Sequence, residues 1–178
     1  QGADGAGGGA VVAAGSTQTW LSSGVVSVIE RIFTRAPSGG PMIEHQSVRV
    51  VAGSGIEGDR YFNCHDEPGQ NITLVEAEAI EGFLSENQRT RDLSVSGRNL
   101  VTRGVSLNGL VGQEFFVGQV RLKGVELCDP CLALGEALAS ATLSPAAVVR
   151  QFVKRGGLRA DVLSTGEISV GAKLQSAA

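Results

Sequence analysis

The chain has few cysteines, little net charge and no long apolar run, and each shortage narrows what it can be. Its 178 residues hold three cysteines, an odd count that excludes a disulfide framework and suits a reducing compartment. A net charge of −3 lacks the basic excess of a general nucleic-acid binder, so no nucleic-acid partner is expected. No eighteen consecutive apolar residues occur, so we expect no transmembrane helix and a soluble protein.

The first 22 residues differ in composition from the rest. They are rich in Gly, Ala and Ser, and Asp4 is their only charged residue. Such a segment has too little apolar surface to compensate for the chain entropy that it would lose on folding. We therefore predict a flexible tail or a leader remnant. The chain begins at Gln1 and its only methionine is Met42, so we expect a processed or truncated form. It would be cytoplasmic, or organellar if the segment is a transit remnant. One ordered domain is expected over residues 23–175.

Short β-rich runs separated by glycine dominate that domain. Strands are predicted over 24–33, 47–53, 113–117 and 119–127, followed by a hairpin and a final strand over 158–174. Within 119–127 the apolar alternation slips by one residue at Gly124, as a β-bulge would produce. A tight glycine-rich loop is expected over 53–62, and Asn108-Gly109 is a turn signal.

Two helices are predicted among these strands. In the first, within 73–86, Thr73 and Glu76 have the T-x-x-E spacing of a capping box. The second covers 145–155, with Ser144 as N-cap and Gly156-Gly157 at its end. Many short strands with two isolated helices indicate a mainly β fold, a compact β-barrel with a few short helices, and not a βαβ arrangement.

The stretch VELCDPCLAL places Cys128 and Cys131 three residues apart, directly after a predicted strand. A redox dithiol is one interpretation, although short turns between the preceding strands are unlike a thioredoxin fold and Asp129 disfavours a thiolate. Two buried core thiols are another. A structural zinc site needs four ligands, and its further candidates are Cys64, His65 and His45.

A fourth interpretation comes from four segments that follow one another along the chain. They are GIEGDRY, ITLVEAEAIE, RNLVTRGVSLNGLVGQEFFVGQVRLKGVELCDPCLAL and GGLRADVLSTGEISVGAKL. Together they resemble the MOSC domain family, named after the C-terminal domain of molybdenum cofactor sulfurase, over about residues 24 to 174. The resemblance implies a compact β-barrel and association with the molybdenum cofactor, a metal held by the dithiolene of a phosphate-bearing pterin.

The resemblance also implies roles for the cysteine segment. In the amidoxime-reducing relatives the second cysteine of the matching C-x-x-C gives its thiolate to molybdenum, which implies Cys131 as the metal ligand here. A thiolate is a soft ligand, suited to a metal already held by sulfur. Cys128 would be a buried neighbour or a partner in sulfur transfer. Asp129 and Pro130 match positions that line the cofactor, where the relatives carry a basic residue.

Cofactor contacts are implied for GRNLVTRG as well. Arg98 and Arg103 would supply cations for the pterin phosphate, and Asn99 would supply a donor and an acceptor for the pterin's amide-like edge. Arg60, in GIEGDRY, would face the site or pair with Asp59. Ordinary surface charge is the alternative for each arginine. Lys154, Arg155 and Arg159, in VKRGGLRADVL, are further candidate phosphate cations, and favourable interaction with the dipole of the second helix is their alternative role.

Three functions follow from these interpretations. The first is a molybdenum-dependent oxidoreductase of small N-oxygenated substrates, with electrons from a partner protein because no flavin, haem or nicotinamide motif is visible. The second is a carrier of persulfide sulfur for metal–sulfur cofactor assembly, loaded by a pyridoxal-phosphate cysteine desulfurase, with Cys131 or Cys128 as the reactive thiol. The third is a structural domain with buried thiols and no ligand.

Overall fold

Residues 26–177 are described in a computed structural model, and the tail predicted for residues 1–22 lies outside them. The described residues form two sheets, three α-helices and two 3₁₀ turns. The strands are β1 (Val28–Thr34), β2 (Ile43–His45), β3 (Ser47–Val51), β4 (Gly55–Ile56), β5 (Ile72–Glu76), β6 (Leu100–Arg103), β7 (Glu114–Val117), β8 (Val120–Leu127), β9 (Leu158–Val162), β10 (Gly166–Ser169) and β11 (Leu174–Ser176). The helical elements are α1 (Ala77–Glu86), η1 (Leu93–Ser96), η2 (Leu107–Leu110), α2 (Leu132–Leu138) and α3 (Pro145–Gln151).

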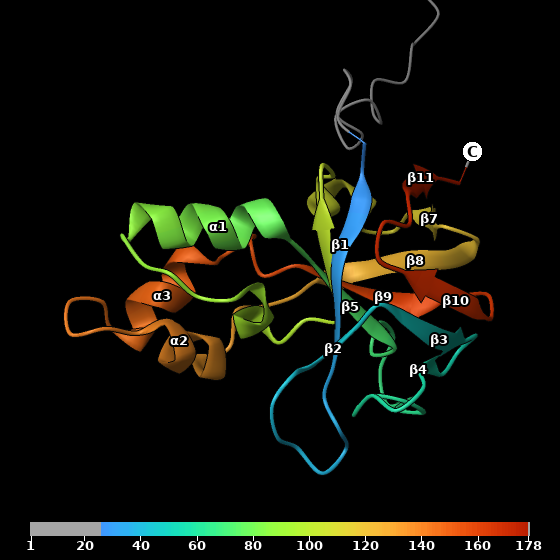
Figure 1. The fold of residues 1–178 in the computed structure, drawn as a ribbon, viewed down its shortest axis with the longest axis horizontal. Helices are drawn as coiled ribbons and strands as arrows, with labels where there is room; N and C mark the ends of the chain where they lie inside the picture. The colour runs from blue at the N-terminus through green and yellow to red at the C-terminus, as the bar shows by residue number, and fades with distance from the viewer. Residues whose placement is uncertain (1–25, 178) are drawn as a thin grey trace, which may run out of the picture.

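Eight strands form one curled half-barrel sheet, in the order β11-β7-β8-β9-β5-β6-β1-β2, and β10-β3-β4 form the smaller sheet. All three α-helices gather on one side of the strands (Figure 1). Two apolar clusters result. Leu74 packs into the cluster among the strands, and Val75 packs into the cluster beneath the helices. Strand β5 is therefore buried on both faces, and the predicted mainly β fold with a few short helices is confirmed.

Several local predictions are confirmed by the backbone. The register of β8 against β9 shifts between Gly124 and Glu126, which is the predicted bulge. Helix α3 begins after Ser144, whose hydroxyl accepts a hydrogen bond from Ala147 N at 3.2 Å. The helix ends at Gln151, four residues earlier than expected.

The predicted capping box is wrong. Thr73 lies inside β5, and α1 begins only at Ala77, with Glu76 at the N-cap position and no side-chain cap. The strand extends this far because Leu74 and Val75 each bury against one of the two apolar clusters. Burial on two faces outweighs the local capping preference of the T-x-x-E sequence.

Two topological expectations also need correction. Strand β5 pairs in parallel with β6 across α1, so one β–α–β unit stands within the half-barrel. Strands β9 and β10 form no hairpin, because β9 pairs with β8 and β5 whereas β10 pairs with β3 in the other sheet. The turn predicted at Asn108-Gly109 is confirmed, because these residues lie in the 3₁₀ turn η2 between β6 and β7. Among the described residues, no helix has the length and apolar character needed to cross a membrane.

Candidate functional site

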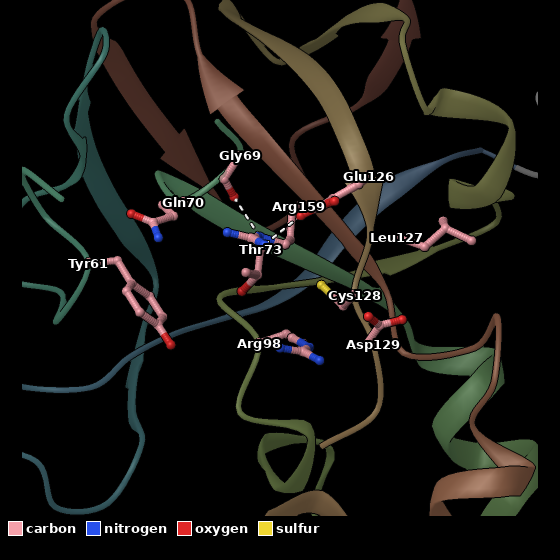
Figure 2. Close-up of a pocket in the computed structure, with 10 residues that line it drawn as sticks. All are labelled: Tyr61, Gly69, Gln70, Thr73, Arg98, Glu126, Leu127, Cys128, Asp129 and Arg159. Carbon is pink, nitrogen blue, oxygen red and sulfur yellow. Dashed lines mark hydrogen bonds and ion pairs between the residues drawn. The ribbon is translucent and has the colours of Figure 1, made fainter. Parts of the chain in front are cut away.

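A pocket of about 320 Å³ opens where the end of β8 meets the loop that leads into β5. Cys128 and Asp129 reach it from the chain just after β8, and Arg98 reaches it from the segment before β6. Tyr61 and Gln70 line it from the loop before β5 (Figure 2). Segments that are far apart in the sequence therefore build one concave site.

The β-bulge in β8 shapes one edge of this pocket. Gly69 packs so closely on the bulge that a Cβ there would lie 2.9 Å from Val125 Cβ. Gly69 N donates to Asp161 Oδ1 at 2.7 Å, and Gly69 O accepts from Arg159 Nε at 3.3 Å. Two side chains of β9 thus hold the loop against the bulge, and only glycine fits between them.

Gly156 and Gly157 hold two pocket-lining residues, Arg98 and Cys128, in place. Gly157 O accepts a hydrogen bond from Cys128 N at 2.8 Å, and Gly156 O accepts one from Arg98 Nε at 3.0 Å. A Cβ at Gly156 would lie 2.4 Å from Cys128 O, and one at Gly157 would lie 2.1 Å from Leu74 O. These two glycines were expected only to end a helix. A helix end requires only one glycine. The second consecutive glycine was therefore the sequence signal for this close backbone crossing.

The Cys128 thiol is buried, with 3% of the residue exposed. Burial raises the pKa of this thiol, and the positive charges of Arg98 and Arg159 offset part of the rise. Cys128 therefore lines the pocket as a neutral thiol at neutral pH.

The two arginines of the pocket differ in their partners. Arg159 pairs with Glu126 and Glu67. Arg98 forms no ion pair within residues 26–177, and its two terminal nitrogens have no hydrogen-bond partner there. Figure 2 shows its guanidinium on the same side of the pocket as Cys128. Arg98 thus places a positive charge and free N–H donors at the pocket wall.

Cys131 lies outside the pocket lining. It occupies the N-cap position of α2 and is exposed to solvent, and Pro130 separates it from the pocket-lining Asp129. Of the two cysteines, one therefore faces the pocket and the other faces solvent. The resemblance singles out the exposed thiol, and the geometry singles out the buried one.

Asn99 lies behind the pocket wall, with only 3% of the residue exposed. Its Oδ1 accepts from Thr73 N and Thr73 Oγ1, each at 3.1 Å, and its Nδ2 donates to Phe33 O at 3.1 Å and Asp59 Oδ1 at 3.2 Å. The carboxamide has used both donors and both acceptor positions. Asn99 belongs to a buried network that supports the pocket and does not line it.

The remaining candidates from the sequence lie at or beyond the rim. Arg103 pairs with Glu30 and Glu81, away from the pocket lining. Arg60 lies over the Tyr61 ring, 4.7 Å from its centroid, so it borders the site through that pocket residue. The pocket thus brings together Arg98, Cys128 and Asp129, together with the further candidate Arg159.

Sequence reasoning missed the pocket roles of Tyr61, Gln70 and Thr73. Gln70 Oε1 is buried and has no hydrogen-bond partner among the described residues. Nothing in the local sequence marked it, because its environment is made by β9 and by the chain after β8. In the part of the chain that the structure describes, no three His, Cys, Asp or Glu side chains cluster as metal ligands. His45 bonds Thr34 Oγ1 through Nε2 at 2.7 Å.

Comparison with solved structures places this fold among known ones. The YuaD protein of Bacillus subtilis superposes with a TM-score of 0.73 at 20% identity, covering 84% of this chain and 94% of that one. YiiM from Geobacillus stearothermophilus gives 0.64 at 17% identity, covering 85% and 75%. YiiM from Escherichia coli gives 0.61 at 18% identity, covering 85% and 70%. At these identities the likeness establishes the fold.

Sequence comparison identifies the family. No curated protein matches the chain at a significant level. The model of the MOSC domain matches residues 62–175, well over half of the chain, including the pocket residues from Gly69 to Arg159. The chain belongs to the MOSC domain family.

Proposed function

We propose that this MOSC domain protein binds a molybdenum cofactor at the pocket beside Cys128 and reduces small N-oxygenated substrates. The observation that carries the proposal is the Arg98 guanidinium, which forms no ion pair within residues 26–177 and lines the same pocket as Cys128, three residues before the exposed Cys131. A phosphate-bearing pterin needs a cation or N–H donors, and a sulfur-bound metal favours a soft thiolate. Electrons would come from a partner protein.

The residues present fit such a group in their chemistry. The two terminal nitrogens of Arg98 are available to an anion, and Arg159 adds a second positive charge although it is already paired. Gln70 Oε1 accepts no hydrogen bond from the described residues. Such a free acceptor suits the N–H groups of a pterin ring. The Tyr61 ring adds an aromatic surface to the wall. These groups would bind and orient the pterin.

Cys131 is the proposed thiolate ligand. It is exposed, so a ligand reaches its sulfur without opening the protein, whereas burial raises the pKa of Cys128 and keeps that thiol protonated. When bound, the cofactor supplies the electron pair for reduction at its metal. Cys128 would then contribute a neutral thiol to the wall, and Asp129 a carboxylate at the rim beside the substrate.

Metal and pterin content test this proposal. The wild type, Cys131→Ser and Cys128→Ser are made in cells that synthesise the cofactor, and each is assayed for molybdenum and for the fluorescence of oxidised pterin. We expect stoichiometric cofactor in the wild type and its loss in Cys131→Ser. Retention in Cys131→Ser with loss in Cys128→Ser would move the ligand to the pocket thiol. Absence of molybdenum and pterin from all three proteins would overturn the proposal.

The exposure of Cys131 favours a second candidate function, persulfide carriage. A desulfurase persulfide would pass its outer sulfur to the Cys131 thiol, regenerating the desulfurase thiol, with no net oxidation. The protein is incubated with a cysteine desulfurase and cysteine, and intact mass is measured before and after reduction. A reducible gain of one sulfur atom in the wild type, absent from Cys131→Ser, would support carriage. An unchanged mass in the wild type would exclude it.

A further inference from the structure

We infer that Asn99 is a positioning residue that holds two walls of the pocket in register through Thr73 and Asp59. The inference rests on the proposed function only in taking this pocket as the ligand site. Asn99 itself is buried and touches no ligand position, so it would act through the residues it binds. Its neighbour Arg98 is the cation of the wall that forms no ion pair with the described residues.

The first wall is held through Thr73. Its hydroxyl donates to Asn99 Oδ1 and accepts from Asn99 N, both at 3.1 Å, and its backbone N also donates to Asn99 Oδ1. Thr73 lines the pocket from β5. These three hydrogen bonds between two buried residues fix this part of β5 relative to the segment that carries Arg98.

The second wall is held through Asp59. This carboxylate is 2% exposed and accepts from Asn99 Nδ2, from Arg35 N at 3.0 Å and from Tyr61 N at 3.1 Å. Tyr61 lines the pocket opposite Cys128. Asp59 thus carries the position of Asn99 to the Tyr61 loop, beside a second link in which Arg60 N donates to Arg35 O at 2.8 Å.

Asn99 is also fixed from a third side, by β1. Phe33 N donates to Asn99 O at 2.7 Å, and Asn99 Nδ2 donates to Phe33 O. The residue therefore joins β1, β5 and the Tyr61 loop at one point. Removing its donor to Asp59 would take away one of the bonds that hold the Tyr61 loop against the strands and would loosen this side of the pocket.

The test is the reactivity of Cys128 with a small thiol reagent, which needs no cofactor. The parent carries Cys64→Ala and Cys131→Ser, so that Cys128 is the only thiol. Asn99→Asp is compared with Asn71→Asp. Asn71 is also buried, its carboxamide also binds two backbone groups, Gly53 O and Val162 N, and it does not line the pocket.

At pH 8, the carboxylate introduced by Asn99→Asp would face the carboxylate of Asp59. The variant loses the hydrogen bond from residue 99 to Asp59 and gains repulsion between two carboxylates. We expect Cys128 to be labelled at least about tenfold faster than in the parent. Asn71→Asp is expected to stay near the parent rate. If the pocket opens locally, little surface is exposed and low concentrations of urea should not change the labelling rate of the variant. Labelling through global unfolding would instead speed up with urea.

Equal, urea-sensitive acceleration in Asn99→Asp and Asn71→Asp would overturn the inference, since it would show a stability effect alone. If Asn99→Asp does not fold, Asn99→Ala and Asn71→Ala, which remove each carboxamide without adding a charge, are compared in the same way. Faster, urea-insensitive labelling in Asn99→Ala alone supports the inference, and equal rates in the two variants contradict it. The labelling of Cys128 can change as expected even if none of the proteins contains molybdenum or pterin. That combination would refute the proposed function and leave this inference standing.

Discussion

The pocket wall and the buried network directly behind it are built from the same short segment, yet they differ in one physical respect. Arg98 reaches the pocket with terminal nitrogens that bind nothing among the described residues. Asn99, the next residue, has all four hydrogen-bonding positions of its carboxamide filled within the protein. Unmatched donors mark the place where a ligand is recognised, and matched ones mark the support that holds it.

The difference also explains why three candidates from GRNLVTRG end in three environments. Arg98 lines the pocket, Asn99 supports it, and Arg103 pairs with Glu30 and Glu81 outside the pocket lining. Sequence proximity suggested one shared role for these residues. Substitutions that act on one region and spare the other can break or sharpen the comparison.

The largest effect is expected from Gly157→Ala, at the glycine whose carbonyl accepts from Cys128 N. Its φ is +105°, and the added Cβ would lie 2.1 Å from Leu74 O, so the backbone must move. We expect a loss of about 3 kcal/mol in the free energy of unfolding, measured by urea denaturation. Gly82→Ala is the control, because Gly82 lies within α1 and its Cβ would meet nothing within 4 Å. It should stabilise by about 0.5–1 kcal/mol.

Thr73→Val removes one hydroxyl from the network. It leaves Asn99 N buried without its acceptor, so we expect a loss of about 2 kcal/mol in unfolding free energy. Thr102→Val is the matched control on β6, since that fully buried hydroxyl only donates, to Val75 O. It should cost about 1 kcal/mol or less. Equal losses in the two variants would argue that the network around Asn99 adds no stability of its own.

Arg98→Gln tests the wall in isolation. It gives up one hydrogen bond to Gly156 O, so a stability change of about 1 kcal/mol or less is expected. Cofactor affinity, measured by retention of pterin on dilution, should fall at least about tenfold because a charge-assisted contact is lost. Arg103→Gln loses ion pairs with the half-buried Glu30 and the exposed Glu81, so it should cost about 1 kcal/mol or less in stability and leave pterin retention unchanged. A similar loss of pterin in Arg103→Gln would contradict this division of roles.

The smallest effect concerns pH. Burial raises the pKa of Cys128 in the folded protein, so the unfolded chain releases this proton first as pH rises. The contribution of this thiol is complete below the unfolded pKa of about 8.5 and declines as pH rises towards the folded value. Comparing the wild type with Cys128→Ala by urea denaturation, we expect their difference to shrink between about pH 7 and pH 9.5. A constant difference would show that the thiol is not buried.

Sequence reasoning succeeded where one local cause was enough. Ser144 caps α3 through its own hydroxyl, and the slipped alternation at Gly124 marks the bulge, because both effects act within a few residues. It failed at Thr73, where a good local capping pattern competed with burial of β5 on two faces. It also missed Gln70, which gains its pocket position only from segments much further along the chain.

The sequence by itself determined that this is a mainly β MOSC domain, because alternation, glycine turns and four ordered segments are properties of the chain alone. Only the tertiary structure decided which thiol faces the pocket, which of the two pocket arginines forms no ion pair within residues 26–177, and that Asn99 is buried behind the wall. Exposure and hydrogen-bond satisfaction depend on what the other strands bring to a residue. Cys128 and Cys131 share one motif and differ in just that respect.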